Sequence, residues 1–135
     1  MAAHERRFTL EEAESLLDST VRELAEQMVE LRGRWRPLQQ AWQRVVMKVG
    51  SNGGGMSTRD TESLREQLEE ITAELNGLIG EITGLGVQIK DVDRGLLDFP
   101  STVDGEEALL CWHVGEPRIA YWHSPEDGFA GRRTL

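Results

Sequence analysis

The sequence predicts an α+β fold, in which a long antiparallel coiled-coil helical hairpin is followed by a small antiparallel β-sheet module. Two stretches, about residues 9–49 and 58–85, carry apolar residues at alternating three- and four-residue spacing, the heptad pattern of paired helices. A Gly-rich segment at 50–56 predicts the turn between them. After residue 86 the apolar period shortens to two, which predicts strands. We expect residues 1–86 and 87–135 to pack together as one domain.

The first helix has a clear start and two irregularities. Thr9 can cap the helix with its hydroxyl, and Glu12 stands three residues on, as a capping box requires. An extra four-residue step between Leu17 and Val21 predicts a stutter, a local adjustment of the supercoil. Pro37 removes a backbone hydrogen bond, but the apolar phase continues past it, so we expect a kinked helix rather than two helices.

The second helix has the most regular pattern in the chain, and Ser57 offers an N-cap for it. Its apolar residues are Leu64, Leu68, Ile71, Leu75, Leu78, Ile82 and Leu85. In an antiparallel hairpin, basic residues of the first helix, Arg32 to Lys48, lie beside acidic residues of the second, Glu62 to Glu74. These charges then set the orientation of the pair; alternatively, they form two solvated faces.

A hairpin of two helices buries only one stripe on each helix, and here the first helix is longer than the second. Trp35 and Trp42 are also large for a seam between two helices. Either the β module or a second copy of the chain must cover the remaining apolar surface. We therefore expect a homodimer with a four-helix core.

The clearest hairpin of the β module joins residues 109–114 to residues 118–123. The connecting loop, residues 115–117, places Cys111 opposite Tyr121. Both faces of this hairpin are largely apolar, and the helices can cover only one of them. The other is predicted to be an exposed face open to a protein partner or a second protomer.

The formal net charge of −9 and the isoelectric point near 4.8 exclude several classes of partner. Duplex nucleic acid and anionic membrane surfaces both need a basic protein face, so we expect neither. The sequence has no apolar run long enough for a membrane span and no apolar signal region. We therefore expect a cytoplasmic protein.

Histidine side chains offer weak candidates for a metal site. His113 and His123 share a strand face but lie about 13 Å apart at about 3.3 Å per residue, so one ion cannot bind both. A metal site would need His123 with a nearby carboxylate, from Asp98, Glu126 or Asp127. We expect no metal and no other cofactor.

Cys111 is the only cysteine, which excludes an intrachain disulfide. Its side chain and that of His113 lie two residues apart on one strand face, about 6–7 Å apart. That is too far for the contact that activates a thiolate. Cys111 is therefore interpreted as a small buried apolar residue.

An aromatic-lined pocket is the remaining candidate site, where the last hairpin meets the tail. Aromatic walls with a few charged groups are typical of a binding cleft. Its candidate ligand-binding residues are Glu116, Tyr121, Trp122, His123 and Arg132. In the alternative interpretation, the aromatic residues belong to the core and Arg132 pairs with an acidic residue that fixes the tail.

These patterns do not determine a function. Long coiled-coil helices serve in assembly more often than in catalysis, so we expect a non-catalytic protein–protein interaction or scaffold module that acts as a homodimer. The alternative is a small-ligand or metal-binding protein that uses the region around His123, Glu116 and Arg132.

Short motifs rich in Trp, Gly and His are spread over the whole chain. They include Phe8-Thr9, Gly86-Val87, Lys90-Asp91, Gly95-Leu96, Asp98-Phe99-Pro100, Leu110-Cys111-Trp112, Gly115-Glu116-Pro117, Tyr121-Trp122-His123 and Gly128-Phe129-Ala130-Gly131-Arg132. The chain thereby resembles the DUF2203 family of bacterial proteins of unknown function. The resemblance implies no established activity, and hence no catalytic residue, cofactor or partner.

Overall fold

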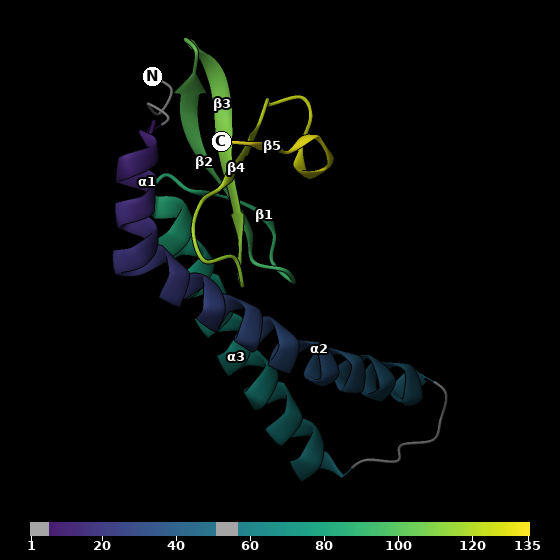
Figure 1. Ribbon diagram of the computed structural model, residues 1–135. Coiled ribbons are helices and arrows are strands. Elements are labelled where there is room, and N and C mark those ends of the chain that lie inside the picture. The colour runs from purple at the N-terminus through teal and green to yellow at the C-terminus, as the bar shows by residue number, and fades with distance from the viewer. Residues whose placement is uncertain (1–5, 51–56) are drawn as a thin grey trace, which may run out of the picture.

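The computed structural model describes residues 6–50 and 57–135, which form an α+β fold (Figure 1). Helices from the N-terminal part of the chain form an antiparallel hairpin, and a five-stranded antiparallel sheet lies beside one end of it. The predicted fold class is thus confirmed. The Gly-rich turn predicted at 50–56 lies outside the described residues, apart from Gly50. Within the described ranges, no helix has the length and apolar character needed to cross a membrane.

The first helix is continuous but changes its winding near its start. The capping box is confirmed, with reciprocal hydrogen bonds of 3.1 Å and 2.9 Å between Thr9 and Glu12. α1 (Leu10–Leu16) leads into a π-helical turn, η1 (Leu17–Val21), and then into α2 (Arg22–Gly50). The wider π turn lies where the sequence has its extra step, at the bend between α1 and α2 in Figure 1. It allows Leu17 and Val21 both to face the core, at 0% exposure.

The two long helices lie side by side for only part of their length. α2 continues through Pro37 without a break. α3 (Thr58–Gly84) begins after Ser57, which caps it as expected. The helices run antiparallel and spread apart toward the C-terminal end of α2 and the N-terminal end of α3 (Figure 1).

The ion pairs expected between the helices do not form at two of the basic positions. Arg32 and Arg36 instead both bind Asp93, each at 2.8 Å, in the connection between the first two strands. The guanidinium of Arg32 also stacks on Trp35 at 4.5 Å. These contacts attach the sheet module to the middle of α2.

The sheet has its strands in sequence order, each antiparallel to the next. They are β1 (Gln88–Asp91), β2 (Leu96–Val103), β3 (Glu106–His113), β4 (Tyr121–His123) and β5 (Arg133–Thr134). Asp104 and Gly105 join β2 to β3 with φ angles of 53° and 81°. Two successive positive φ angles match the twist of a tight hairpin, so this turn fixes the register of β2 on β3.

The three-residue loop predicted between residues 109–114 and 118–123 is wrong, although the predicted register is right. Cys111 pairs with Tyr121, but β4 begins only at Tyr121, so the connection spans residues 114–120. The backbone carbonyl of Glu116 accepts a hydrogen bond from Trp112 Nε1 at 2.9 Å, and its carboxylate accepts one from the β3 backbone. These local bonds hold a wide turn instead of extending the ladder.

One face of the sheet packs against the helices and forms the main core. Leu97, Phe99, Leu110 and Trp112 are each at most 1% exposed on this face. They form one apolar cluster with buried residues of α1, η1, α2 and α3. The chain before α1 joins the sheet as well, since the N–H of Phe8 donates to the carbonyl of Pro100 at 2.7 Å.

The second face of the sheet is not exposed, and the expectation of an open β face is therefore wrong. Residues 124–132 fold back over it. The ring centroids of Phe129 and His113 lie 6.3 Å apart, and the guanidinium of Arg132 lies 4.1 Å from the Tyr121 ring. Leu109, on the same face, is only 9% exposed. The chain's own tail covers the surface that was expected to bind a partner.

Candidate functional site

Asp98, Cys111 and His123 meet on the second face of the sheet, and we call them the Asp–Cys–His cluster. Directly paired residues of antiparallel strands point to the same side of a sheet. Asp98 pairs with Cys111 across β2 and β3, and Leu109 pairs with His123 across β3 and β4. Because Leu109 and Cys111 are two positions apart, all three side chains of the cluster share one face. Each is at most 3% exposed.

His123 is held between two hydrogen-bond acceptors. Its Nε2 lies 3.0 Å and 3.1 Å from the two carboxylate oxygens of Asp98, and its Nδ1 lies 2.8 Å from the carbonyl oxygen of Ser124. A neutral imidazole carries only one N–H. If Nδ1 donates to the carbonyl, Nε2 turns a lone pair toward a carboxylate. A positive charge, from a second proton or a metal ion, resolves this conflict.

Cys111 completes the cluster but is not a prepared nucleophile. Burial, followed by the nearby Asp98 carboxylate, raises the pKa of the thiol to about 12, against an opposing effect of Arg132. The side chain is therefore a neutral thiol at neutral pH, and only a thiolate attacks. One potential ligand atom from each of the three residues lies within 4.8 Å of the others. The arrangement suits ligation better than nucleophilic catalysis.

A small pocket of about 160 Å³ adjoins the cluster. Besides the cluster, its lining consists of Lys90, Leu96, Leu109, Pro125, Gly128 and Phe129. The strands form one wall and the tail forms the other. A water molecule occupies about 30 Å³ in the liquid, so the pocket has room for water or a small ligand beside the cluster.

Arg132 and Glu116 form a second polar group on the same face. Arg132 Nη2 lies 2.6 Å and 2.8 Å from the carboxylate oxygens of Glu116, and each side chain is 14% exposed. The guanidinium is stacked between the Tyr121 ring, at 4.1 Å, and the Phe129 ring, at 4.7 Å. This pair fixes the tail on the sheet, as the alternative interpretation of Arg132 proposed.

The predicted ligand-binding residues thus divide among three places. Glu116, Tyr121 and Arg132 lie together, whereas His123 belongs to the Asp–Cys–His cluster. Trp122 lies on the opposite face, where it packs against the main core. Among the weak metal candidates, Asp98 joins His123, whereas Glu126 and Asp127 are exposed. Asp127 lies 3.8 Å from Arg133 instead.

Sequence reasoning missed Cys111 as a neighbour of Asp98. The signal was present in the Asp104-Gly105 turn, because counting outward from a two-residue turn pairs Asp98 with Cys111. Comparing Cys111 only with His113, on its own strand, overlooked the strands on either side. The contact follows from the pairing of neighbouring strands, and this pairing joins residues that are distant in sequence, so a local pattern does not reveal it.

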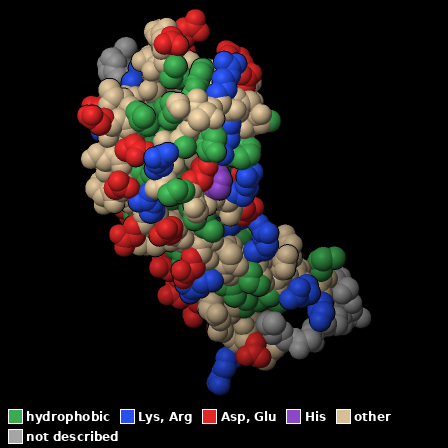
Figure 2. Space-filling view, in the orientation of Figure 1, with side chains coloured by type: hydrophobic (Ala, Val, Ile, Leu, Met, Phe, Trp, Pro, Cys, Tyr) green, Lys and Arg blue, Asp and Glu red, His purple; other side chains and the backbone are tan. Residues whose placement is uncertain are grey.

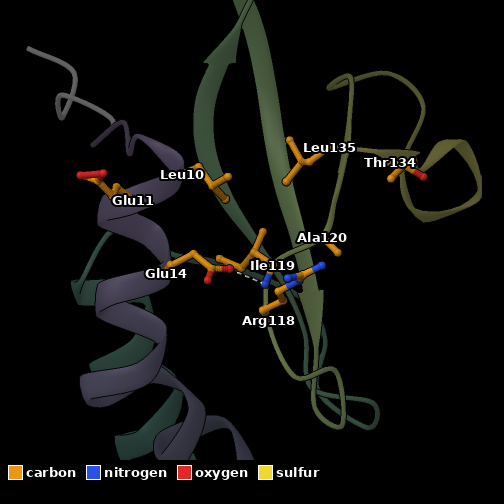
Figure 3. A pocket seen from close by; sticks show the side chains of 8 residues that line it. All are labelled: Leu10, Glu11, Glu14, Arg118, Ile119, Ala120, Thr134 and Leu135. Carbon is orange, nitrogen blue, oxygen red and sulfur yellow. Dashed lines mark hydrogen bonds between the residues drawn. The ribbon is translucent and has the colours of Figure 1, made fainter.

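A larger, more open cleft of about 610 Å³ lies between α1 and the end of the sheet (Figure 3). Its lining comprises Leu10, Glu11, Glu14, Arg118, Ile119, Ala120, Thr134 and Leu135. Glu14 is not free to bind a ligand, since its carboxylate accepts a 2.6 Å hydrogen bond from the backbone N–H of Ile119. The cleft was not predicted from the sequence, since it depends on how α1 sits against the sheet.

The comparisons with known proteins identify a family but no activity. The family model described as "Uncharacterized conserved protein (DUF2203)" matches residues 6–135. No curated protein and no solved structure shows significant similarity to the chain.

Proposed function

Because the chain belongs to the DUF2203 family, whose description assigns no activity, we propose a function from its geometry: a non-catalytic protein–protein interaction or scaffold module that acts as a homodimer. The contact surface is the part of the helical hairpin that extends beyond the sheet. We call this part the helical arm and define it as residues 37–48 and 58–70. In this proposal, the helical arm packs against the helical arm of a second copy, and the helices pack as a coiled coil.

The observation that carries the proposal is that the apolar pattern continues along the arm while burial declines. On α2, the last buried residue with a described side chain is Leu31, whereas Trp42 and Val45 are only partly buried. Val46 and Met47 are 54% and 74% exposed. Figure 2 shows hydrophobic side chains at the surface of this arm. A second arm packed against the first would remove them from water.

Trp35 is better explained within one chain than by a dimer. Its indole N–H donates to the Thr72 hydroxyl at 2.9 Å, and Arg32 stacks on its ring. Trp35 therefore does not require a second copy of the chain to cover it. The proposed contact is restricted to the part of the hairpin beyond it.

Charge favours a two-fold arrangement of the arms. Arg44 on α2, and Glu62 and Glu66 on α3, form no ion pair with another described residue. A two-fold axis between two arms allows α2 of one copy to lie beside α3 of the other. Positive and negative groups would then lie opposite each other at the rim, which favours this orientation more than it adds affinity.

The test is the mass of the protein in solution. Light scattering at tens of micromolar should give twice the mass of one chain. Met47→Glu, which places a charge on an exposed apolar position, should shift the equilibrium to monomer. Gln27→Glu adds the same charge at an exposed site on α2 outside the arm and should leave the dimer intact. A monomeric wild-type protein would overturn the proposal.

The alternative, a small-ligand or metal-binding protein using the region around His123, Glu116 and Arg132, has uneven support. Glu116 and Arg132 neutralise each other, so they offer little to an incoming ligand. The surroundings of His123, by contrast, favour a metal ion.

A further inference from the structure

We infer that Asp98, Cys111 and His123 form a binding site for one divalent metal ion of the zinc class. A carboxylate oxygen of Asp98, Sγ of Cys111 and Nε2 of His123 are its protein ligands. The inference is independent of the proposed dimer, because the cluster lies on the sheet and the dimer surface lies on the helical arm.

The spacing of the ligand atoms fits a single ion. Zinc binds imidazole nitrogen and carboxylate oxygen at about 2.0–2.2 Å and thiolate sulfur at about 2.3 Å in tetrahedral geometry. Ligand atoms around one ion therefore lie about 3.3–3.8 Å apart. In the cluster they lie within 4.8 Å of one another, and Nε2 is 3.0 Å from its nearer carboxylate oxygen. Small side-chain rotations bring all three to bonding distance.

The orientation of His123 supports a metal more directly. Histidine ligands in metal sites usually donate their second N–H to a carbonyl or carboxylate, which aims the other nitrogen at the ion. Nδ1 of His123 has such a partner in the Ser124 carbonyl, at 2.8 Å. Its Nε2 then presents a lone pair to the space that it shares with Asp98 and Cys111. The ion supplies the positive charge that this space requires.

The charges of the ligand set match a dication. The Asp98 carboxylate and Cys111 bound as a thiolate carry two negative charges, which balance the two positive charges of the ion, while His123 binds as a neutral imidazole. The proton of the Cys111 thiol leaves to solvent as the Sγ–metal bond forms. Burial therefore does not oppose the bound ion through an unbalanced charge.

The ligand types select the metal. Calcium and magnesium take oxygen ligands, whereas a set of thiolate, imidazole and carboxylate suits zinc and related transition ions. Three protein ligands leave one position of a tetrahedral ion open. The adjoining pocket of about 160 Å³ has room for water in that position.

The test uses cobalt(II) as a visible substitute for zinc. Full-length protein, prepared without nickel chromatography and stripped with a chelator, is titrated with cobalt chloride. We expect saturation at one ion per chain, visible bands of tetrahedral intensity, a near-ultraviolet thiolate-to-cobalt charge-transfer band, and loss of all bands on adding zinc. Since Cys111 is the only cysteine, this charge-transfer band identifies the ligand without a variant.

Two variants act as controls for the titration. His123→Ala should abolish the bands, whereas His113→Ala, which removes a partly buried histidine outside the cluster, should retain them. Circular dichroism checks that each variant is folded. Cobalt binding without a charge-transfer band, or no binding by folded wild-type protein, would overturn the inference, because a cluster that holds only protons gives neither signal.

Discussion

The carboxylate of Glu14 in α1 accepts a hydrogen bond of 2.6 Å from the backbone N–H of Ile119. The two residues are 105 positions apart, and the bond ties the first helix to the connection between β3 and β4. Ile119 is itself 3% exposed and belongs to the main core. This one bond therefore helps to set the angle between α1 and the sheet.

Glu14→Ala should lower the free energy of unfolding by about 1–3 kcal/mol, because it leaves the partly buried N–H of Ile119 without its acceptor. Glu11→Ala is the matched control. Glu11 lies one turn earlier in α1, lines the same cleft and is exposed, so its removal should cost less than about 0.5 kcal/mol. Urea denaturation of both variants measures the difference, and equal losses would contradict this role of Glu14.

Gly95→Ala should be strongly destabilising. Gly95 has a φ of +63°, and an added Cβ would overlap Val114 Cγ2 and lie 2.9 Å from Val29 Cγ2. Left-handed backbone strain and overpacking together should lower the free energy of unfolding by about 2–4 kcal/mol. Gly80→Ala lies in α3, where the new Cβ would have no atom within 4 Å apart from its chain neighbours and the backbone of its own helix, so it should instead raise the free energy of unfolding by about 0.5–1 kcal/mol. The melting temperatures of the two variants should shift in opposite directions from that of the wild-type protein.

Arg132→Ala should lower the free energy of unfolding by about 3 kcal/mol, since it leaves the largely buried Glu116 carboxylate without its guanidinium partner. Arg133→Ala removes a neighbouring arginine that is 60% exposed and makes a long ion pair of 3.8 Å. It should cost less than about 1 kcal/mol. In a double-mutant cycle, the variant that carries both Glu116→Gln and Arg132→Ala should lose less free energy of unfolding than the two single variants lose in sum. An additive result would mean that the two residues act separately.

In metal-free protein, the Cys111 thiol should resist a disulfide reagent until the protein unfolds. Its pKa of about 12 leaves about one thiolate in ten thousand at pH 8. The folded pKa exceeds the unfolded value of 9.0, so the protonated thiol stabilises the fold below about pH 9. This contribution is lost as the pH rises toward 12. Stability should therefore fall more steeply above pH 9 in wild-type protein than in Cys111→Ala, as urea titrations at several pH values would show.

The helices could be predicted because their signals are local. The capping box of Thr9 and Glu12 forms within a single turn of the chain, so neighbouring residues determine its geometry. The extra step between Leu17 and Val21 predicted an adjustment of the supercoil, and the structure has a π turn there, which the pattern alone did not specify. The orientation of Arg32 and Arg36 could not be obtained in this way, because Asp93 reaches them only after the sheet has packed on α2.

The site could be predicted only in part, because it forms between strands. The register of Cys111 on Tyr121 was correct, and so was the choice of Asp98 as a possible neighbour of His123. The pairing of Arg132 with an acidic residue was one of the two interpretations offered, but the covering of the second face by the tail was not foreseen. That covering depends on the Arg132–Glu116 pair, on the stacking of Arg132 with two rings and on the pairing of β5 with β4. Such contacts produce no periodic pattern of residues in the sequence.

The shared apolar cluster has a consequence for how the molecule loses its structure. Phe8, Ala13 and Leu17 lie against the same interior as Phe99 and Trp112, so neither the hairpin nor the sheet has a complete interior of its own. A chain cut near residue 86 would leave an apolar face of each fragment exposed to solvent, and both fragments would be prone to aggregation and proteolysis. The intact chain should melt all at once, with helix and tryptophan signals lost at one temperature.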